Sequence, residues 1–443
     1  MSARDLAVVL AVLSALPFCL ARPWIGVLTW TWLALMNPHQ LTWGFAQFLP
    51  LSQLVGAATL VGFIFTGSRK RFVWSREMLL LTFLWVWFAA TSAMALYPAD
   101  AWDKFEQMSK ILLMAFLMVP LFQDREKFRL LVFVIAGSIG FYGIKGGVFV
   151  LATGGQYQEL GPDRAFFGAN TEMALALNMV LPFLVYLARE ETRRWMRWGL
   201  YAAFVLTMIS VPFTYSRGGV IGLVVVLVVL FRKARQRVLL IPVIAGGLVA
   251  FAMFAPAQWV SRMQTLEDVQ SDGSGNLRRM SWQVAMGIAG DRPIFGGGFR
   301  VFLHRATYDI YMPEYPRTFG HDAHSIYFNM LGEHGWVGLG AFVALIVLSL
   351  LKLRSLRRLA RANPQIAWAS NYGHMLQASF ATYLVNGAFL SVAYFDLAYQ
   401  MLIMVPLLYA IAKQQLEAPP REPVEAEAAP VPAVVDATPV GRR

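Results

Sequence analysis

GHDAHSIYFNMLGEHGWVG, residues 320–338, joins a long polar stretch to an apolar run that can cross a membrane as a helix. It contains three of the six histidines of the chain, His321, His324 and His334. His321 and His324 are therefore predicted where an extramembrane loop enters the bilayer. A neutral imidazole there can take a proton from a hydroxyl near pH 7. The alternative is that these histidines cap the helix or lie in the headgroup layer.

The composition is that of an integral membrane protein. Of the 443 residues, 57% are hydrophobic and 14% are charged, whereas soluble domains carry about 25% charged residues. The apolar runs have helical lengths and do not alternate, which excludes an outer-membrane barrel. The single cysteine, Cys19, excludes a disulfide framework and a Cys-based metal site. Because Met1 to Ala21 lacks a basic start, we expect no removable signal peptide.

The apolar segments predict an all-α polytopic membrane protein with 12 or 13 transmembrane helices. The segment at 24–37 is short for a hydrocarbon core of about 30 Å. Pro17 and Pro23 interrupt the first two segments, which we expect to form a hairpin or a partly embedded pair. The segments lie near residues 5–21, 24–37, 51–67, 78–96, 108–122, 129–152, 169–188, 197–214, 218–231, 238–256, 326–351, 374–392 and 394–412.

The basic residues indicate the orientation of the chain. Five short connections hold 20 of the 38 lysines and arginines and fall at alternate loops. The positive-inside rule places all five in the cytoplasm. The net charge of +12 is therefore a topology signal, and nucleic-acid binding is not expected. The connections are Arg69–Arg76, Arg125–Arg129, Arg189–Arg197, Arg232–Arg237 and Lys352–Arg361.

This orientation divides the chain into four parts. Residues 1–255 are expected to hold the transmembrane helices 1 to about 10, and residues 326–412 the C-terminal transmembrane helices. Between them, residues 256–325 form one large outer loop, which is periplasmic in a Gram-negative host. Residues 413–443 are rich in Pro, Ala, Val and Glu and predict a disordered cytoplasmic tail.

The outer loop combines phosphate-binding residue types with an amphipathic helix. It contains seven arginines, no lysine and seven carboxylates, and guanidinium groups match phosphate oxygens bidentately. A helix is expected from a cap at Ser274 or Asn276 to Asp291, before a turn at Gly296–Gly298. Arg279 would project from its first turn. Three tyrosines follow that would line a sugar site or anchor the loop in the interface: Tyr308, Tyr311 and Tyr315.

Three further charges are predicted at the outer surface of the membrane: Lys145, Glu172 and Arg217. Such charges are costly in a bilayer, so they face a cavity or a partner. One interpretation is snorkelling to the interface together with a Lys145–Glu172 ion pair. The other is a phosphate site, because glycines flank both Lys145 and Arg217 and expose backbone N–H donors.

The order of several short motifs resembles the O-antigen ligase and polymerase superfamily of bacterial envelope enzymes. These motifs are Ser216–Gly219, Arg279 with Trp282 leading to Pro293 and Gly296–Gly298, and His324–Ser325 followed by Glu333–Gly335. The stretches RPWIGVLTWTWLALMNPHQLTWGFA (22–46) and GFYGIKGGVF (140–149) also resemble exosortase-associated O-glycosylation ligases. Together the resemblance covers most of residues 1–412.

The resemblance implies a glycosyltransferase of the bacterial inner membrane with its active site facing the periplasm and its C-terminus in the cytoplasm. Such enzymes transfer a glycan from undecaprenyl pyrophosphate to an acceptor hydroxyl, which O-antigen ligases find on lipid A–core oligosaccharide. They are usually described with twelve spans and without metal, nucleotide or other cofactor. The expected partners are therefore the lipid-linked donor, lipid A–core and membrane lipids, with no nucleic acid.

This chemistry assigns roles to the candidate residues. His324 is expected to act as general base on the acceptor hydroxyl, while Arg217, Arg279 and Lys145 bind the pyrophosphate where negative charge grows. A single displacement would invert the anomeric centre. The outer loop lacks an Asp-x-Asp or a carboxylate cluster, in agreement with metal independence. The second-rank site residues are His321, Arg300, Arg278, Glu172 and Tyr215.

Other functions remain open at this point. An O-antigen polymerase, or a ligase for protein O-glycosylation, would use the same donor with a different acceptor. A polytopic transporter would use Lys145, Glu172 and Arg217 as a substrate or coupling-ion site. Transporters place such charges near the midplane on discontinuous helices, whereas here the three are expected at one face beside a large loop. Glu333 follows His324 by about 13 Å along a helix, too far to orient its imidazole.

Overall fold

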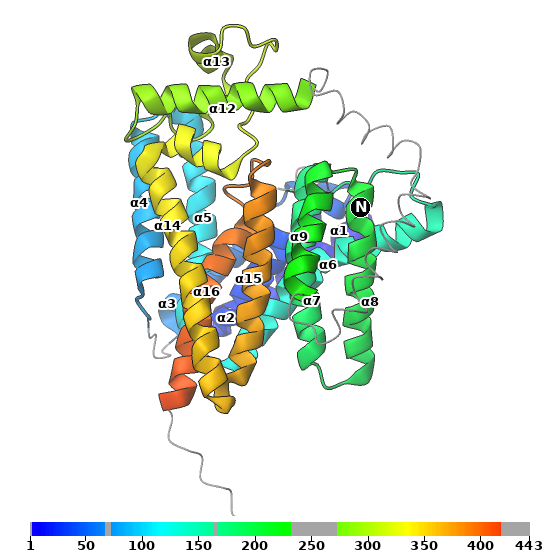
Figure 1. Cartoon of the computed structure of the whole chain (residues 1–443). Coiled ribbons are helices and arrows are strands. Elements are labelled where there is room, and N and C mark those ends of the chain that lie inside the picture. The colour runs from blue at the N-terminus through cyan, green and yellow to red at the C-terminus, as the bar shows by residue number, and fades with distance from the viewer. Residues whose placement is uncertain (1, 67–71, 163–166, 232–272, 418–443) are drawn as a thin grey trace, which may run out of the picture.

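The computed structural model describes residues 2–66, 72–162, 167–231 and 273–417. Figure 1 shows most helices side by side as a bundle, with α12 (Gly273–Asp291) lying across one end and α13 (Arg305–Tyr311) beyond it. The predicted segment at 238–256, the basic residues at 69–71 and 232–237, and the start of the outer loop to residue 272 lie outside the described residues. So does the predicted tail from residue 418 on, whereas residues 413–417, predicted as the start of that tail, are the helical end of α16 (Asp396–Glu417).

The described elements are helices, and the described ranges contain no strand. Short 3-10 turns such as η1 (Pro38–Leu41), η2 (Phe45–Phe48) and η3 (Val211–Thr214) link some of them. The remaining α-helices are α1 (Ala3–Ala21), α2 (Pro23–Met36), α3 (Leu51–Phe65), α4 (Arg76–Ala93), α5 (Pro98–Leu121), α6 (Arg125–Thr153), α7 (Asn170–Glu190), α8 (Arg194–Ser210), α9 (Arg217–Phe231), α14 (Ile326–Ala362), α15 (Ala367–Gly387) and α16 (Asp396–Glu417).

Six of the described helices are long and apolar enough to cross a membrane, and three shorter ones are also apolar. The predicted all-α, multi-pass architecture is therefore confirmed, while the count of 12 or 13 spans stays a prediction. The six are α1, α6, α7, α8 with η3, α14 and α16, and the shorter ones are α2, α3 and α9.

The first three helices form a compact group. Only Arg22 separates α1 from Pro23, the first residue of α2, so these two helices fold back on each other. Gly62 of α3 lies directly against the carbonyl of Leu20, and a Cβ there would clash with it. Pro17 stays inside α1. The structure thus shows the hairpin expected for the first two segments.

The described parts of the basic connections that the sequence predicts on one side lie at one end of the bundle. At the start of α6, Nη2 of Arg125 lies 3.9 Å from Oε2 of Glu190 at the end of α7. The guanidinium carbon of Arg125 lies 4.9 Å from the ring centroid of Trp368 in α15. Lys352 of α14 pairs with Glu77 at the start of α4. In Figure 1, α12 covers the opposite end. We call these the basic end and the α12 end; their placement in cytoplasm and periplasm stays a prediction.

A break in α14 ties the outer segment to the bundle. Gly335 has φ 69° and ψ −173°, which interrupts the helix and leaves nearby carbonyls without intrahelical partners. The Gly296–Gly298 turn uses them: the N–H of Gly297 donates to the carbonyl of Gly332 at 2.8 Å, and that of Gly298 to the carbonyl of Glu333 at 2.9 Å. The turn predicted from the three glycines is therefore the docking point of the outer segment on α14.

Candidate functional site

His321 and His324 lie together just before α14, at the α12 end. Their Nε2 atoms are 3.2 Å apart and their ring centroids 4.5 Å apart. His324 has a left-handed backbone with φ 46°, an uncommon conformation that the surrounding structure must hold. Its peptide N–H donates to the hydroxyl of Ser391, in the connection between α15 and α16, at 2.9 Å. A connection that lies 67 residues further along the chain therefore helps to fix the position of this residue.

Helix α12 holds the same segment from the outer side. The indole N–H of Trp282 donates to the carbonyl of Ala323 at 2.8 Å, and its ring stacks on Phe328 with centroids 4.9 Å apart. On the other flank, Asp322 accepts from the amide of Asn329 at 2.9 Å. These contacts hold the segment with the two histidines between α12 and the start of α14.

Two of the three tyrosines predicted in the outer loop, Tyr308 and Tyr315, have a different role from either one predicted. Tyr308 and Tyr315 are buried, with ring centroids 4.2 Å apart. The Tyr308 hydroxyl donates to the carbonyl of His321 and lies 2.7 Å from the hydroxyl of Ser281. Because these two rings form the core of the outer layer, they neither line a sugar site nor anchor the loop in a lipid interface.

Both imidazoles are kept neutral by their surroundings. Burial lowers the pKa of His324 to about 3, and the charges of His321, Arg278 and Arg317 act in the same direction. Burial, followed by Arg317, also lowers the pKa of His321. The Nδ1 atom of each ring is buried without a hydrogen-bond partner among the described residues. Both imidazoles are therefore unprotonated, and burial together with the nearby arginine charges keeps them so.

Of the two consecutive arginines in α12, Arg278 is the one that acts on the histidines. Its charge lowers the pKa of both imidazoles. Arg279 is exposed, and its guanidinium donates to the side chain of Asn276 at 3.0 Å. Arg278 precedes Trp282 by four residues, which places the two on one face of the helix. The sequence interpretation ranked Arg279 first because it considered only the position of this residue in the first turn of the helix. It did not consider which residue shares a face with Trp282.

Arg217 begins α9 at the same end of the bundle. The preceding Ser216 is buried, and its hydroxyl accepts the N–H of Gly219 at 3.0 Å, as an N-cap does. Tyr215 has φ 56°, and its hydroxyl donates to the carbonyl of Gly155 at 2.9 Å. The SRGG motif thus forms a capped helix start that holds Arg217, half-buried, at the surface. Tyr215 holds the turn that precedes it.

Helix α15 connects this arginine to the histidine pair. Gly222, further along α9, faces the side chain of Asn386 near the end of α15. The next residue of α15, Gly387, faces Ile326, two positions after His324. Arg217 and His324 therefore flank the same end of α15, in agreement with the helix order in Figure 1.

The other predicted charges lie elsewhere or have partners. Lys145 is exposed in a groove of about 840 Å³. Burial raises the pKa of the nearby Glu159, and the charge of Lys145 offsets part of this increase. Glu172, expected to pair with Lys145, accepts a hydrogen bond from the hydroxyl of Thr171 at 2.7 Å. Arg300 forms an ion pair with Asp103 at 2.6 Å.

A buried polar network below the histidines was not predicted. Glu333 accepts the peptide N–H of Arg300 at 2.8 Å and the hydroxyl of Tyr394. The same hydroxyl lies 2.8 Å from Nε2 of His334, whose Nδ1 lies 2.7 Å from the hydroxyl of Thr91. The network joins α4, the break in α14 and the connection before α16, and no local sequence pattern reports such contacts.

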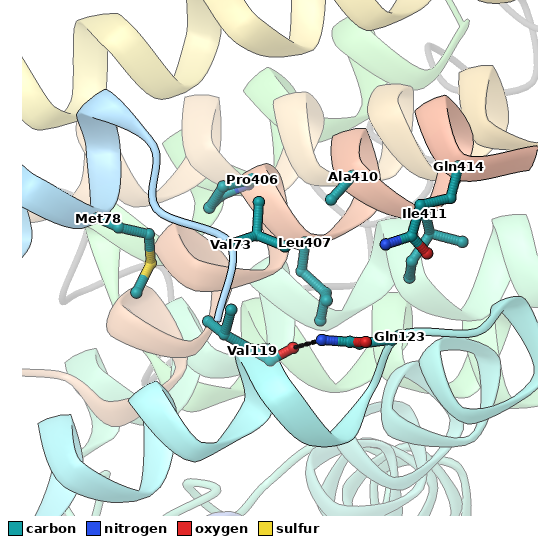
Figure 2. A pocket seen from close by; sticks show the side chains of 9 residues that line it. All are labelled: Val73, Met78, Val119, Gln123, Pro406, Leu407, Ala410, Ile411 and Gln414. Carbon is teal, nitrogen blue, oxygen red and sulfur yellow. Dashed lines mark hydrogen bonds between the residues drawn. The ribbon is translucent and has the colours of Figure 1, made fainter. Parts of the chain in front are cut away.

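A much smaller cavity lies at the basic end, between α4, α5 and α16. Figure 2 shows its lining, with the side-chain amide of Gln123 donating to the carbonyl of Val119 at 3.4 Å. Its volume is about 10 Å³, room for no more than about one water molecule. It is no candidate for a substrate site.

Within the described ranges, no group of three His, Cys, Asp or Glu side chains is arranged to hold a metal ion. The metal independence of the reaction stays a prediction.

Two family models match the chain. Residues 3–192 match a family of unknown function, and this part contains Lys145. Residues 202–343 match the O-antigen ligase family, and this part contains Arg217, Arg278 and His324. No curated protein matches the chain significantly. Residues 202–343, which include the helix start at Arg217 and the outer layer around the histidine pair, are thus the part of the chain that is similar to the O-antigen ligase family.

Proposed function

We propose that the protein is an O-antigen ligase of the bacterial inner membrane. It transfers a glycan from undecaprenyl pyrophosphate to a hydroxyl of lipid A–core oligosaccharide, with the α12 end facing the periplasm and the C-terminus in the cytoplasm. The observation that carries the proposal is the His324–His321 pair, neutral and 3.2 Å apart, in the part of the chain matched to the ligase family.

His324 acts as the general base. The acceptor oxygen forms a bond to the anomeric carbon while the bond from that carbon to the pyrophosphate oxygen breaks. The hydroxyl proton passes to His324, and undecaprenyl pyrophosphate leaves with the bonding electrons. Attack from the face opposite the leaving group inverts the anomeric centre. The hydrogen bond to His321 orients the imidazole and offers the proton a second position.

The surrounding positive charge links basicity to donor binding. With the pKa of His324 at about 3, the imidazole is a weak base in the free protein. A bound pyrophosphate neutralises the Arg278 and Arg317 charges that help to lower this pKa. Donor binding therefore raises the basicity of His324 when the reaction needs it.

Two arginines bind the pyrophosphate in this proposal. Arg217 approaches from the start of α9, and Arg278 from α12 beside the histidines. Guanidinium groups stabilise the charge that develops on the leaving phosphate. Arg278 takes the role that the sequence assigned to Arg279, because Arg279 is exposed and bonded to Asn276.

The test is glycan transfer by purified protein in detergent, with undecaprenyl-pyrophosphate-linked glycan, lipid A–core and EDTA. We expect transfer by wild type and its collapse in His324→Ala and Arg217→Ala, with folding intact. Arg279→Ala is the matched control and keeps its activity. Full activity in His324→Ala would remove the general-base assignment, and loss of wild-type transfer in EDTA would remove metal independence.

The same assay separates the alternatives by acceptor. Extension of the donor glycan without transfer to lipid A–core would identify an O-antigen polymerase. Transfer only to a protein acceptor would identify a protein O-glycosylation ligase, the activity of the enzymes that the amino-terminal half resembles. Absence of any transfer, with glycan lipid moved across a vesicle membrane, would favour a transporter.

A further inference from the structure

The groove that contains Lys145 is separate from the histidine pair. It is formed by α1, the end of α2, the turns that follow and the outer part of α6. Lys145 lies 20 residues after Arg125, or about 30 Å along the helix from the basic end. The groove therefore opens at the level of the α12 end. His324 is held by α12, α14 and the connection after α15.

The walls of the groove are apolar along its length and cationic at its outer end. Val8 and Ala11 of α1, Trp32 of α2 and Phe141 of α6 supply hydrocarbon surface. Its volume of about 840 Å³ lies within the usual range for a ligand pocket, roughly 300–1,000 Å³. A hydrocarbon chain that lies along these helices would be shielded on the protein side and still reach the lipid.

Two cations mark the outer end of this groove. Arg4 lies with its guanidinium carbon 4.6 Å from the ring centroid of the exposed Trp43, and Lys145 is exposed on the facing helix. Among the described lining residues there is no Asp or Glu. Asp5, next to Arg4, is buried and accepts from the hydroxyl of Ser2 and the N–H of Ala46. Glu159 is buried behind Lys145.

We propose that this groove binds undecaprenyl pyrophosphate at a second site, with Arg4 and Lys145 on the pyrophosphate and the prenyl chain along α1 and α6. The charges favour this occupant: two cations suit a head group with two or more negative charges on adjacent phosphates, whereas phosphatidylglycerol carries one. The proposal rests on the proposed function for the identity of the lipid. This second site would bind the undecaprenyl pyrophosphate product, or a second donor molecule, away from the reaction centre.

Native mass spectrometry of the full chain in detergent, with glycan-free undecaprenyl pyrophosphate added, tests the site. The background is Arg217→Ala/Arg278→Ala, so that the lipid retained reports the groove alone. We expect Arg4→Gln/Lys145→Gln to weaken retention about tenfold or more, because the pyrophosphate loses its charge-assisted contacts with both cations. The matched control, Arg358→Gln/Lys413→Gln, removes two exposed cations near the basic end and keeps retention unchanged.

A second variant tests the chain-binding part. Ala11→Trp fills the apolar groove, so it should weaken retention of the prenyl lipid but leave binding of inorganic pyrophosphate unchanged. Equal retention of phosphatidylglycerol and undecaprenyl pyrophosphate would overturn the proposal, as would unchanged lipid retention in both groove variants. Because no glycan is transferred, failure of the ligase assay and failure of this binding assay are distinguishable.

Discussion

His324 and His321 share a hydrogen bond between their Nε2 atoms at 3.2 Å, although only two residues separate them in a segment without regular structure. The left-handed backbone of His324, with φ 46°, turns its ring back towards His321. Ser391 holds the peptide N–H in this conformation. The geometry of the pair therefore depends on the connection between α15 and α16 as well as on the loop itself.

Substitutions in the pair should have unequal effects on transfer. His324→Gln removes the general base, and we expect kcat to fall about 100- to 10,000-fold. His321→Gln keeps a hydrogen-bonding group beside His324, so kcat should fall about tenfold and the pH dependence of kcat should shift. Steady-state transfer assays from acidic to alkaline pH measure both. Equal losses in the two variants would contradict a single base.

The two arginines of α12 form a matched pair for a second prediction. Arg278→Ala removes a charge that acts on both histidines and, in our proposal, on pyrophosphate, so transfer should fall about 100-fold or more. Arg279→Ala removes an exposed side chain bonded to Asn276 and should stay within about twofold of wild type. Transfer assays with equal amounts of folded protein measure the loss of activity in both variants. A larger loss in Arg279→Ala would restore the sequence-based ranking.

The arginine pair also shows what sequence reasoning can reach. Composition and the basic connections predicted a multi-pass helical protein, because hydrophobic length and charge act locally along the chain. The same reasoning placed a helix at α12 and a turn at Gly296–Gly298, both of which the structure contains. Our proposal prefers Arg278 to Arg279 because of the face of α12 that meets α14, and this face depends on tertiary packing.

The sequence could not predict the long-range polar contacts either, because they also depend on tertiary packing. Tyr394, Glu333 and Thr91 come from three separate parts of the chain, and their hydrogen bonds through His334 have no local signature. The helices that surround Lys145 were also unknown from the sequence, which predicts a depth in the membrane for this residue but not its neighbours. The order of the apolar segments predicts the depth of a residue in the membrane, whereas the packing of the helices determines which residues surround it.

The buried network yields a stability prediction. Tyr394→Phe removes the hydroxyl that donates to Glu333 and contacts His334, and leaves two buried polar atoms short of a partner. We expect a loss of about 1–3 kcal/mol in the free energy of unfolding. Tyr157→Phe, at an exposed tyrosine, is the control and should change it little. Thermal unfolding in detergent measures both, and equal stability of the two variants would argue against a tight network.

The low pKa of His324 predicts a pH-dependent stability. In the unfolded chain its pKa is near 6.5, and in the folded protein it is about 3. Below about pH 6.5 the unfolded state therefore takes up a proton that the folded state does not bind until about pH 3. Stability should decrease as the pH falls through this window. His324→Gln should show a shallower decrease in unfolding temperature from about pH 7 to about pH 4, and parallel profiles would contradict the buried neutral state.

Two glycines in the outer segment provide a matched test of how this segment is attached. Gly296 has φ 65°, and a Cβ there would lie 2.7 Å from the backbone of Glu333 and Gly335. Gly296→Ala should therefore lower stability by about 2 kcal/mol or more and loosen α12. Gly290, inside α12, has open space around its Cβ position, so Gly290→Ala should raise stability by up to about 1 kcal/mol. Hydrogen exchange of the α12 amides, measured with thermal unfolding, distinguishes them. Faster exchange only in Gly296→Ala is expected, because the broken helix α14 holds the outer segment through this turn.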